Sequence, residues 1–268
     1  MKNLFLFLGF VFLLQAAAAQ TVPSDCTASG NIETIYADDA DRLALRHVLT
    51  NFLPEKDSVE IPEALSDSVL RALIAVYNAT PLAARDTVVS MLDIHTFPLP
   101  VMTRFYIAAD SSLPWMQALE NNIFPTGNTT IDNMLTNFNL AVTSYYQLST
   151  YDMVIFQSGD NYNLLALMDA ITAIPGVQFA EPDGIFGDGD DISAMLFPGY
   201  TQLTYSHGWG DCPSGCIHRR YWQFNVYPDC SVEFVTSYGD PVDHVTGLSP
   251  SMPDEAVAFP NPFSNEIV

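Results

Sequence analysis

A glycine-interrupted acidic segment, residues 181–191, is the part of this sequence whose residue types come closest to a defined chemistry. It holds Glu181, Asp183, Asp188, Asp190 and Asp191. Carboxylate oxygens on a flexible turn are the ligands that calcium requires, so the four aspartates form a candidate calcium site. Their spacing is not that of an EF-hand, and runs of charge are commonly solvated. We therefore favour a solvated acidic loop, with calcium as the alternative and no other cofactor expected.

The cysteines are a second set of residues whose spacing suggests chemistry. There are four of them: Cys26, Cys212, Cys216 and Cys230. An even number is typical of disulfides in an exported protein. Proline and glycine let the segment 212–216 reverse sharply, so we expect the pairs Cys212–Cys216 and Cys26–Cys230, with Cys212–Cys230 as the open alternative. A zinc site using the neighbouring His207 and His218 is disfavoured, because the spacing fits no standard zinc module.

Motifs of nucleophilic or metal-dependent hydrolysis are missing from the sequence. It contains no G-x-S-x-G elbow, no H-E-x-x-H and no phosphate-binding glycine loop. With 31 acidic residues, pairs of carboxylates are inevitable and indicate no glycosidase by themselves. The aromatic residues Trp115, Trp209, Trp222 and Tyr221 could form a platform for sugars, although core packing is the favoured role for most of them. A protein that is not an enzyme is therefore preferred.

The composition excludes some classes of partner. The chain has 268 residues, 31 acidic against 9 basic residues, and a formal net charge of −22. Binding of nucleic acid needs clustered lysine and arginine, and binding of an anionic membrane surface is disfavoured for the same reason. Hydrophobic residues make up 49% of the chain, so it can bury a substantial core.

The first nineteen residues have the pattern of a secretory signal peptide. Lys2 precedes an apolar stretch from Leu4 to Leu14, and small residues follow, which predicts cleavage between Ala19 and Gln20. The apolar stretch is shorter than the roughly 20 residues that a membrane-spanning helix needs. No later stretch is long and apolar enough to span a bilayer. We therefore expect the mature protein to be exported.

The remaining elements predict one α+β domain over residues 20–240. Apolar residues at helical spacing predict helices over 38–53 and 66–78, within a helical part at 36–95. Residues 100–181 show the order β-α-(α)-β-β-α-β, which suggests a ferredoxin-like sandwich. Residues 192–238 are rich in strands, and Pro228-Asp-Cys230 makes a hairpin turn. We expect the N-terminal helices to pack on the ferredoxin-like part, which a C-terminal antiparallel sheet extends.

The C-terminal residues carry a resemblance to a known family. After a proline-rich linker at 241–257, residues 258–268 include the motif Pro260, Asn261, Pro262, Phe263 and Ser264. This motif resembles the opening of the C-terminal sorting domain of cargo of the Bacteroidetes type IX secretion system. The resemblance implies the type IX secretion machinery as a partner, and a mature protein that passes through the periplasm and is then secreted or displayed on the outer membrane. A complete sorting domain continues beyond Val268, so we expect a fragment or a truncated signal.

Two further resemblances concern the body of the chain. The segments 36–46, 180–184 and 208–216 are similar to exported Bacteroidetes proteins that carry the same sorting domain, which implies a destination and no activity. Residues 174–183 resemble the end of the ferredoxin-like propeptide inhibitors of subtilisin-type proteases. The leading expectation is therefore a non-enzymatic secreted or surface protein that binds an extracellular protein or glycan. The alternative is an extracellular hydrolase, and the third is a module that inhibits proteases.

Overall fold

The structure, a computed structural model, describes residues 20–242. The predicted signal peptide with Ala19, the linker beyond residue 242 and the sorting motif at 260–264 lie outside the described residues. Helices and two antiparallel sheets make up the described chain. The predicted α+β class is therefore confirmed. None of the described helices combines the length and the apolar character that crossing a membrane would take.

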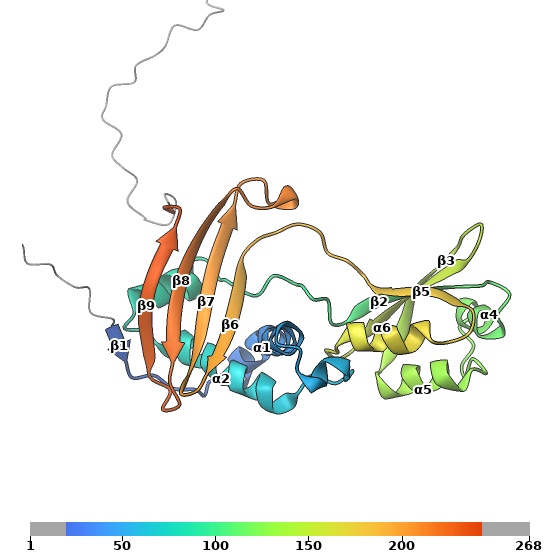
Figure 1. Cartoon of the computed structure of the whole chain (residues 1–268), viewed down its shortest axis with the longest axis horizontal. Helices are drawn as coiled ribbons and strands as arrows, with labels where there is room; N and C mark the ends of the chain where they lie inside the picture. The colour runs from blue at the N-terminus through green and yellow to red at the C-terminus, as the bar shows by residue number, and fades with distance from the viewer. Residues whose placement is uncertain (1–19, 243–268) are drawn as a thin grey trace, which may run out of the picture.

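Two sheets occupy the two ends of the molecule (Figure 1). The five-stranded sheet has the order β1-β9-β8-β7-β6, with β1 at Gln20–Val22, β6 at Asp191–Phe197, β7 at Tyr200–Trp209, β8 at His218–Val226 and β9 at Val232–Gly239. The four-stranded sheet has the order β3-β4-β2-β5, with β2 at Arg104–Ala109, β3 at Leu140–Gln147, β4 at Asp152–Ser158 and β5 at Val177–Pro182. Every neighbouring pair of strands is antiparallel.

The N-terminal helices cover one face of the five-stranded sheet. They are α1 (Gly30–Thr50), α2 (Glu63–Asn78), α3 (Ala83–Arg85) and the π-helix η2 (Asp86–Met91), with the 3-10 turn η1 (Pro54–Asp57) between the first two. Leu43 and Leu73 belong to one buried cluster with Tyr205, Trp222 and Phe224 of the sheet. The expected packing of these helices on the ferredoxin-like part is therefore wrong. The strands β6–β9 alternate, so one of their faces is apolar and needs these helices as cover.

The second lobe has its own core. Helices α4 (Pro114–Glu120), α5 (Thr129–Asn137) and α6 (Leu164–Thr172) lie on one side of the four-stranded sheet (Figure 1). Trp115, Leu167 and Ile171 meet Phe105 and Phe156 there. One β-α-β unit runs from β2 to β3 and the other from β4 to β5. In the sheet, β4 lies between the two strands of the first unit, and β2 lies between the two strands of the second. We interpret this split arrangement as ferredoxin-like. The segment that resembles propeptide inhibitors runs from α6 into the edge strand β5.

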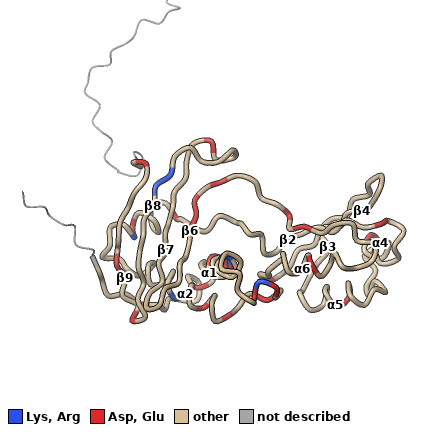
Figure 2. The backbone as a smooth tube through the Cα atoms, viewed as in Figure 1, with Lys and Arg blue, Asp and Glu red and all other residues tan. Residues whose placement is uncertain are grey.

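Covalent and polar links tie the chain together. The disulfides are Cys26–Cys230 and Cys212–Cys216, so the expected pairing is confirmed and the alternative Cys212–Cys230 does not form. Between the lobes, the Asn163 amide donates to the carbonyl oxygens of Lys56 at 2.8 Å and Ser58 at 2.9 Å. Acidic residues are spread over the turns and loops of both lobes (Figure 2), as expected for a solvated surface.

Candidate functional site: the open face of the five-stranded sheet

The structure separates the four aspartates of the candidate calcium site. Each of them lies against a different basic side chain: Asp183 against Arg104 at 2.7 Å, Asp188 against Arg219, Asp190 against His207 at 2.7 Å and Asp191 against Arg46 at 2.9 Å. Among residues 20–242, no three His, Cys, Asp or Glu side chains group closely enough to hold a metal ion. The candidate calcium ligands therefore do not form a common site, and they fix the loop to the strands instead.

Asp188 illustrates how the loop is fixed. Burial by itself would raise the pKa of its carboxyl group, but hydrogen bonds from Arg219 and from the backbone N–H groups of Gly189 and Cys216 lower it below the ordinary value. The carboxylate therefore remains charged beside the guanidinium. The zinc hypothesis is also unsupported, because both cysteines beside the histidines are in disulfides and His218 faces Asp240 at 3.1 Å.

The strands β6–β9 turn a second, different face away from the helices. Their inner residues are apolar and buried against α1 and α2. Their outer residues are mostly hydroxyl, amide and aromatic side chains with one methionine: Ser193, Met195, Gln202, Thr204, Ser206, Tyr221, Gln223, Asn225, Thr236 and Tyr238. Thr204 and Ser206 are buried among them, and Asp191, Arg219 and Glu233 are charged residues of the same face. We call this surface the open face.

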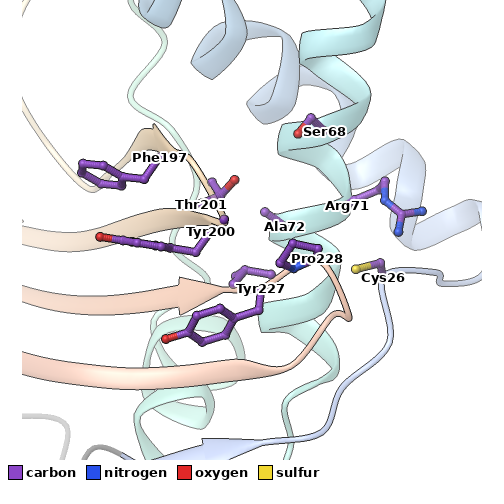
Figure 3. A pocket seen from close by; sticks show the side chains of 11 residues that line it. Cys26, Ser68, Arg71, Ala72, Phe197, Tyr200, Thr201, Tyr227 and Pro228 are labelled. Atoms are coloured by element: carbon purple, nitrogen blue, oxygen red, sulfur yellow. The ribbon is translucent and has the colours of Figure 1, made fainter.

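Three aromatic rings gather where the open face meets the hairpin turns. Phe197 ends β6 and Tyr200 begins β7, and they are paired across a two-residue turn in which Gly199 has a φ of +103°. Their ring centroids are 4.9 Å apart with the planes 24° from parallel. Tyr227, which follows β8, lies 6.0 Å from Tyr200. Figure 3 shows Phe197 and Tyr200 pointing the same way from neighbouring strands. We call these three residues the aromatic cluster.

A row of hydrogen-bonding side chains adjoins the aromatic cluster. The Gln202 amide donates to Asn225 at 3.0 Å, and the Asn225 amide donates to Glu233 at 3.0 Å. The Tyr227 hydroxyl also donates to Glu233, at 2.6 Å, and this bond raises the pKa of Tyr227. The row therefore holds its amide and carboxylate groups in fixed positions beside the rings.

The far end of the open face repeats this combination of rings and polar groups. Tyr221 and Tyr238 stack with centroids 4.8 Å apart and planes 16° from parallel. Beside them is a shallow depression of about 260 Å³, lined by Asp188, Asp191, Ser193, Thr204, Ser206, Arg219 and Tyr221. Tyr200 and Ser206 are six residues apart on β7, so the two ends lie roughly 20 Å apart along the strand.

The aromatic residues expected to form a platform have different roles. Trp115 is 4% exposed and Trp222 is 6% exposed, each inside one of the two cores. Trp209 stacks between His207 and His218, with ring centroids 5.4 and 5.5 Å away. Of the four, Tyr221 lies on the open face. Sequence reasoning missed the aromatic cluster, although the alternation of β6–β8 and the Phe-Pro-Gly-Tyr turn could have indicated it.

A separate cleft lies between the lobes. It has a volume of about 880 Å³ and is lined by Asp38, Asp41, Glu60, Glu63, Asp67 and Asp160, with no lysine or arginine among its lining residues. Asn161 donates from one amide nitrogen to Asp38 at 2.8 Å and to Asp41 at 2.9 Å. Two carboxylates of the cleft are therefore held next to each other.

Comparison with known proteins adds no name to this geometry. No protein-family model and no curated protein sequence matches the chain. The functional argument therefore rests on the residues of the open face and of the pockets beside it.

Proposed function

We propose that this protein binds an extracellular glycan on the open face of its five-stranded sheet and catalyses no reaction there. The observation that carries the proposal is the aromatic cluster of Phe197, Tyr200 and Tyr227 beside the row of Gln202, Asn225 and Glu233. Aromatic rings offer apolar faces, and sugars present apolar C–H faces that stack on them. Amide and carboxylate groups pair with the hydroxyl groups at the sugar's edge.

A glycan suits this surface better than a protein does. Residues that dominate protein–protein affinity are bulky side chains seated in fully desolvated pockets, whereas the rings here lie on the face of a sheet beside half-buried amides. The two ring pairs also lie about 20 Å apart along one strand direction. This spacing favours an extended, repeating ligand that lies along the sheet.

The binding proposal is tested by affinity electrophoresis of the full chain in gels that contain soluble polysaccharides. We expect retardation by at least one polysaccharide, and loss of it in the double variant Tyr200→Ala, Tyr227→Ala. The matched control is Tyr146→Ala, because Tyr146 is 47% exposed on β3 of the other lobe. Unchanged retardation of the double variant, or equal loss in the control, would overturn the assignment to this face.

We further propose that the protein is exported as type IX secretion cargo of Bacteroidetes. The signal-peptide pattern, the motif at Pro260–Ser264 and the two disulfides support this compartment. In a Bacteroidetes host that expresses the gene's complete product, deletion from residue 258 onward should leave the protein in the periplasm, while the complete product reaches the surface or the medium. Mass spectrometry of the exported chain should find Gln20 as its first residue. Identical locations of both forms would contradict the role of the motif.

The interlobe cleft supports hydrolysis of an extracellular polymer as a second candidate function. The observation that favours it is the pair Asp38 and Asp41, which share one amide donor in a cavity large enough for a substrate. Two neighbouring carboxylates are what a glycosidase uses as acid and nucleophile or base. Release of reducing ends from polysaccharides that disappears in both Asp38→Asn and Asp41→Asn would favour this candidate. Failure to release any would remove it.

A further inference from the structure

A small pocket beside the aromatic cluster has an arginine in its lining. It has a volume of about 250 Å³ and lies between α2 and the turns at the ends of β6, β7 and β8. Ser68, Arg71 and Ala72 of α2 line it together with Cys26, Thr201, Pro228 and the three rings. No aspartate or glutamate is among the lining residues, in a chain whose net charge is −22. Arg71 and the rings border the pocket from opposite sides (Figure 3).

Arg71 forms no ion pair within 4.0 Å with a described carboxylate. The pKa of Asp25 is lowered mainly by the hydrogen bonds from Thr27, and the charge of Arg71 adds a smaller effect. Among the lysines and arginines at positions 20–242, the residues that pair with a carboxylate within 4.0 Å are Arg46, Lys56, Arg85, Arg104 and Arg219. Arg42 and Arg220 instead donate to hydroxyl or carbonyl oxygens. The hydrogen bond found for Arg71 reaches the sulfur of Cys230 at 3.8 Å, and a sulfur atom is a weak acceptor. Most of its donors therefore remain available to a ligand.

Three acidic residues are next in sequence to residues that line the pocket. Asp67 of α2 lines the interlobe cleft, and Asp25 and Asp229 are turned toward their own loops. Asp25 accepts hydrogen bonds from the backbone N–H and the hydroxyl of Thr27. Asp229 accepts the equivalent bonds from Ser231. These bonds fix both carboxylates at the rim, and neither comes within ion-pair distance of Arg71. The pocket itself is left with one cation and the hydroxyl groups of Ser68 and Thr201.

We propose that this pocket binds the carboxylate group of an acidic sugar, and that the glycan bound on the open face therefore contains uronic acid. The inference rests on the proposed glycan binding, and it names the substrate class of that site. The planar guanidinium presents two parallel N–H donors that match a carboxylate. Because the surrounding surface repels anions, an acidic glycan is recognised where the local charge is reversed. The neighbouring rings then stack against the same chain of sugars.

The test compares two forms of one polymer by isothermal titration calorimetry with the full chain. The probes are oligogalacturonate and its fully methyl-esterified form, which have the same rings and differ in charge. We expect the acid form to bind about tenfold more tightly than the ester, as charge-assisted bidentate bonds do, and added salt to reduce the difference. Arg71→Gln should remove the preference for the acid form while leaving the ester's affinity unchanged. Arg71→Lys, which keeps the positive charge, should retain part of the preference for the acid form.

The outcomes distinguish the pocket from the open face. Equal affinity of the wild type for both forms, or an unchanged preference in Arg71→Gln, overturns the inference while glycan binding stands. Absence of binding to either form and to neutral polysaccharides overturns the proposed function, and the inference with it. A sulfated galactan that binds as tightly, with the same dependence on Arg71, overturns the carboxylate specificity. Circular dichroism of both Arg71 variants verifies that α2 and the sheet remain folded.

Discussion

The two sheets of this protein each have one face without helices, and aromatic residues are arranged differently on the two. On the four-stranded sheet, Phe179 meets Tyr106 and Tyr151 edge to face, with interplanar angles of 86° and 79°. On the five-stranded sheet, Phe197–Tyr200 and Tyr221–Tyr238 lie within 24° and 16° of parallel. In an edge-to-face pair, the edge of one ring covers a face of the other. In a parallel pair at the rim of a sheet, the outer face of each ring remains uncovered.

The surroundings of the rings reinforce this difference. Beside Tyr106 and Phe179, Ala108 is fully buried and Ile155 is 7% exposed, so these rings complete a second small apolar layer. Beside Tyr200 and Tyr227, the neighbouring groups are amides and a carboxylate that hydrogen-bond to one another. Similar residue types therefore serve stability on one sheet, and we propose that they serve recognition on the other. The following predictions test that distinction.

The largest expected effect is on the five-stranded lobe and comes from its disulfide. Cys26–Cys230 closes a loop with a sequence separation of 204 residues. Replacing both cysteines by serine should lower the free energy of unfolding by about 5 kcal/mol, because so long a loop gains much entropy in the unfolded chain. Urea unfolding followed by tryptophan fluorescence measures the change. The double variant at Cys212 and Cys216, which are 4 residues apart, should lose about 2 kcal/mol; equal losses would contradict this account.

The second prediction separates the two aromatic groups. Phe179→Ala should lower the free energy of unfolding by about 2 to 3 kcal/mol, because it removes two edge-to-face contacts and uncovers the apolar layer. Retardation by polysaccharide should not change. Tyr200→Ala should instead weaken the retardation by polysaccharide, and it should lower the free energy of unfolding by less than about 1 kcal/mol. If Phe179→Ala weakened glycan binding as much as Tyr200→Ala, the division of roles between the sheets would be wrong.

A third, smaller effect tests the length of the open face. Tyr221→Ala removes one ring of the distant pair, so it should weaken binding of long oligosaccharides by about three- to fivefold. Oligosaccharides too short to reach from Tyr200 to Tyr221 should bind unchanged. Calorimetric titrations with a length series measure both effects. A loss that is independent of ligand length would indicate that Tyr221 acts through the fold of the sheet.

The local elements were largely predictable from the sequence. The helix expected at 66–78 is α2 at Glu63–Asn78, since its apolar stripe is clear, and the tight turn at 212–216 gave the correct disulfide pairs. The start of α1 at Gly30 was missed, although Ile32, Ile35 and Tyr36 follow a helical spacing. Helix α3 and the π-helix η2 fall inside the helical part predicted at 36–95.

The candidate sites depended on contacts that no local pattern contains. Asp183, Asp188 and Asp191 looked like neighbours with one role, yet their cationic partners Arg104, Arg219 and Arg46 come from distant elements. The aromatic cluster likewise forms because two hairpin turns meet at the same end of the sheet. Sequence spacing predicts which residue types are present in a loop, and the topology decides which of them meet.

The smallest predicted effect is a dependence of the free energy of unfolding on pH, and it again distinguishes the two lobes. Asp39, 3% exposed in α1, accepts hydrogen bonds from the backbone N–H of Thr96 at 2.8 Å and from His95 at 2.5 Å. The hydrogen bond to Asp39 raises the pKa of His95, and burial opposes this rise. Asp93, at 3.6 Å, raises the pKa further. The four-stranded lobe, residues 104–182, contains no histidine.

Because the folded-state pKa of His95 is raised, its contribution to stability is fully present below an unfolded pKa of about 6.5 and is lost as the pH rises through the folded value. The free energy of unfolding of the wild type should therefore exceed that of His95→Gln by more at pH 5.5 than at pH 8.5. The change in this difference should be about 0.5 kcal/mol, since solvent screens a ring that is a third exposed. The ionisation of surface carboxylates affects both proteins equally and cancels in the difference. A difference that is constant or grows with pH would show that the Asp39–His95 contact does not depend on the histidine's charge.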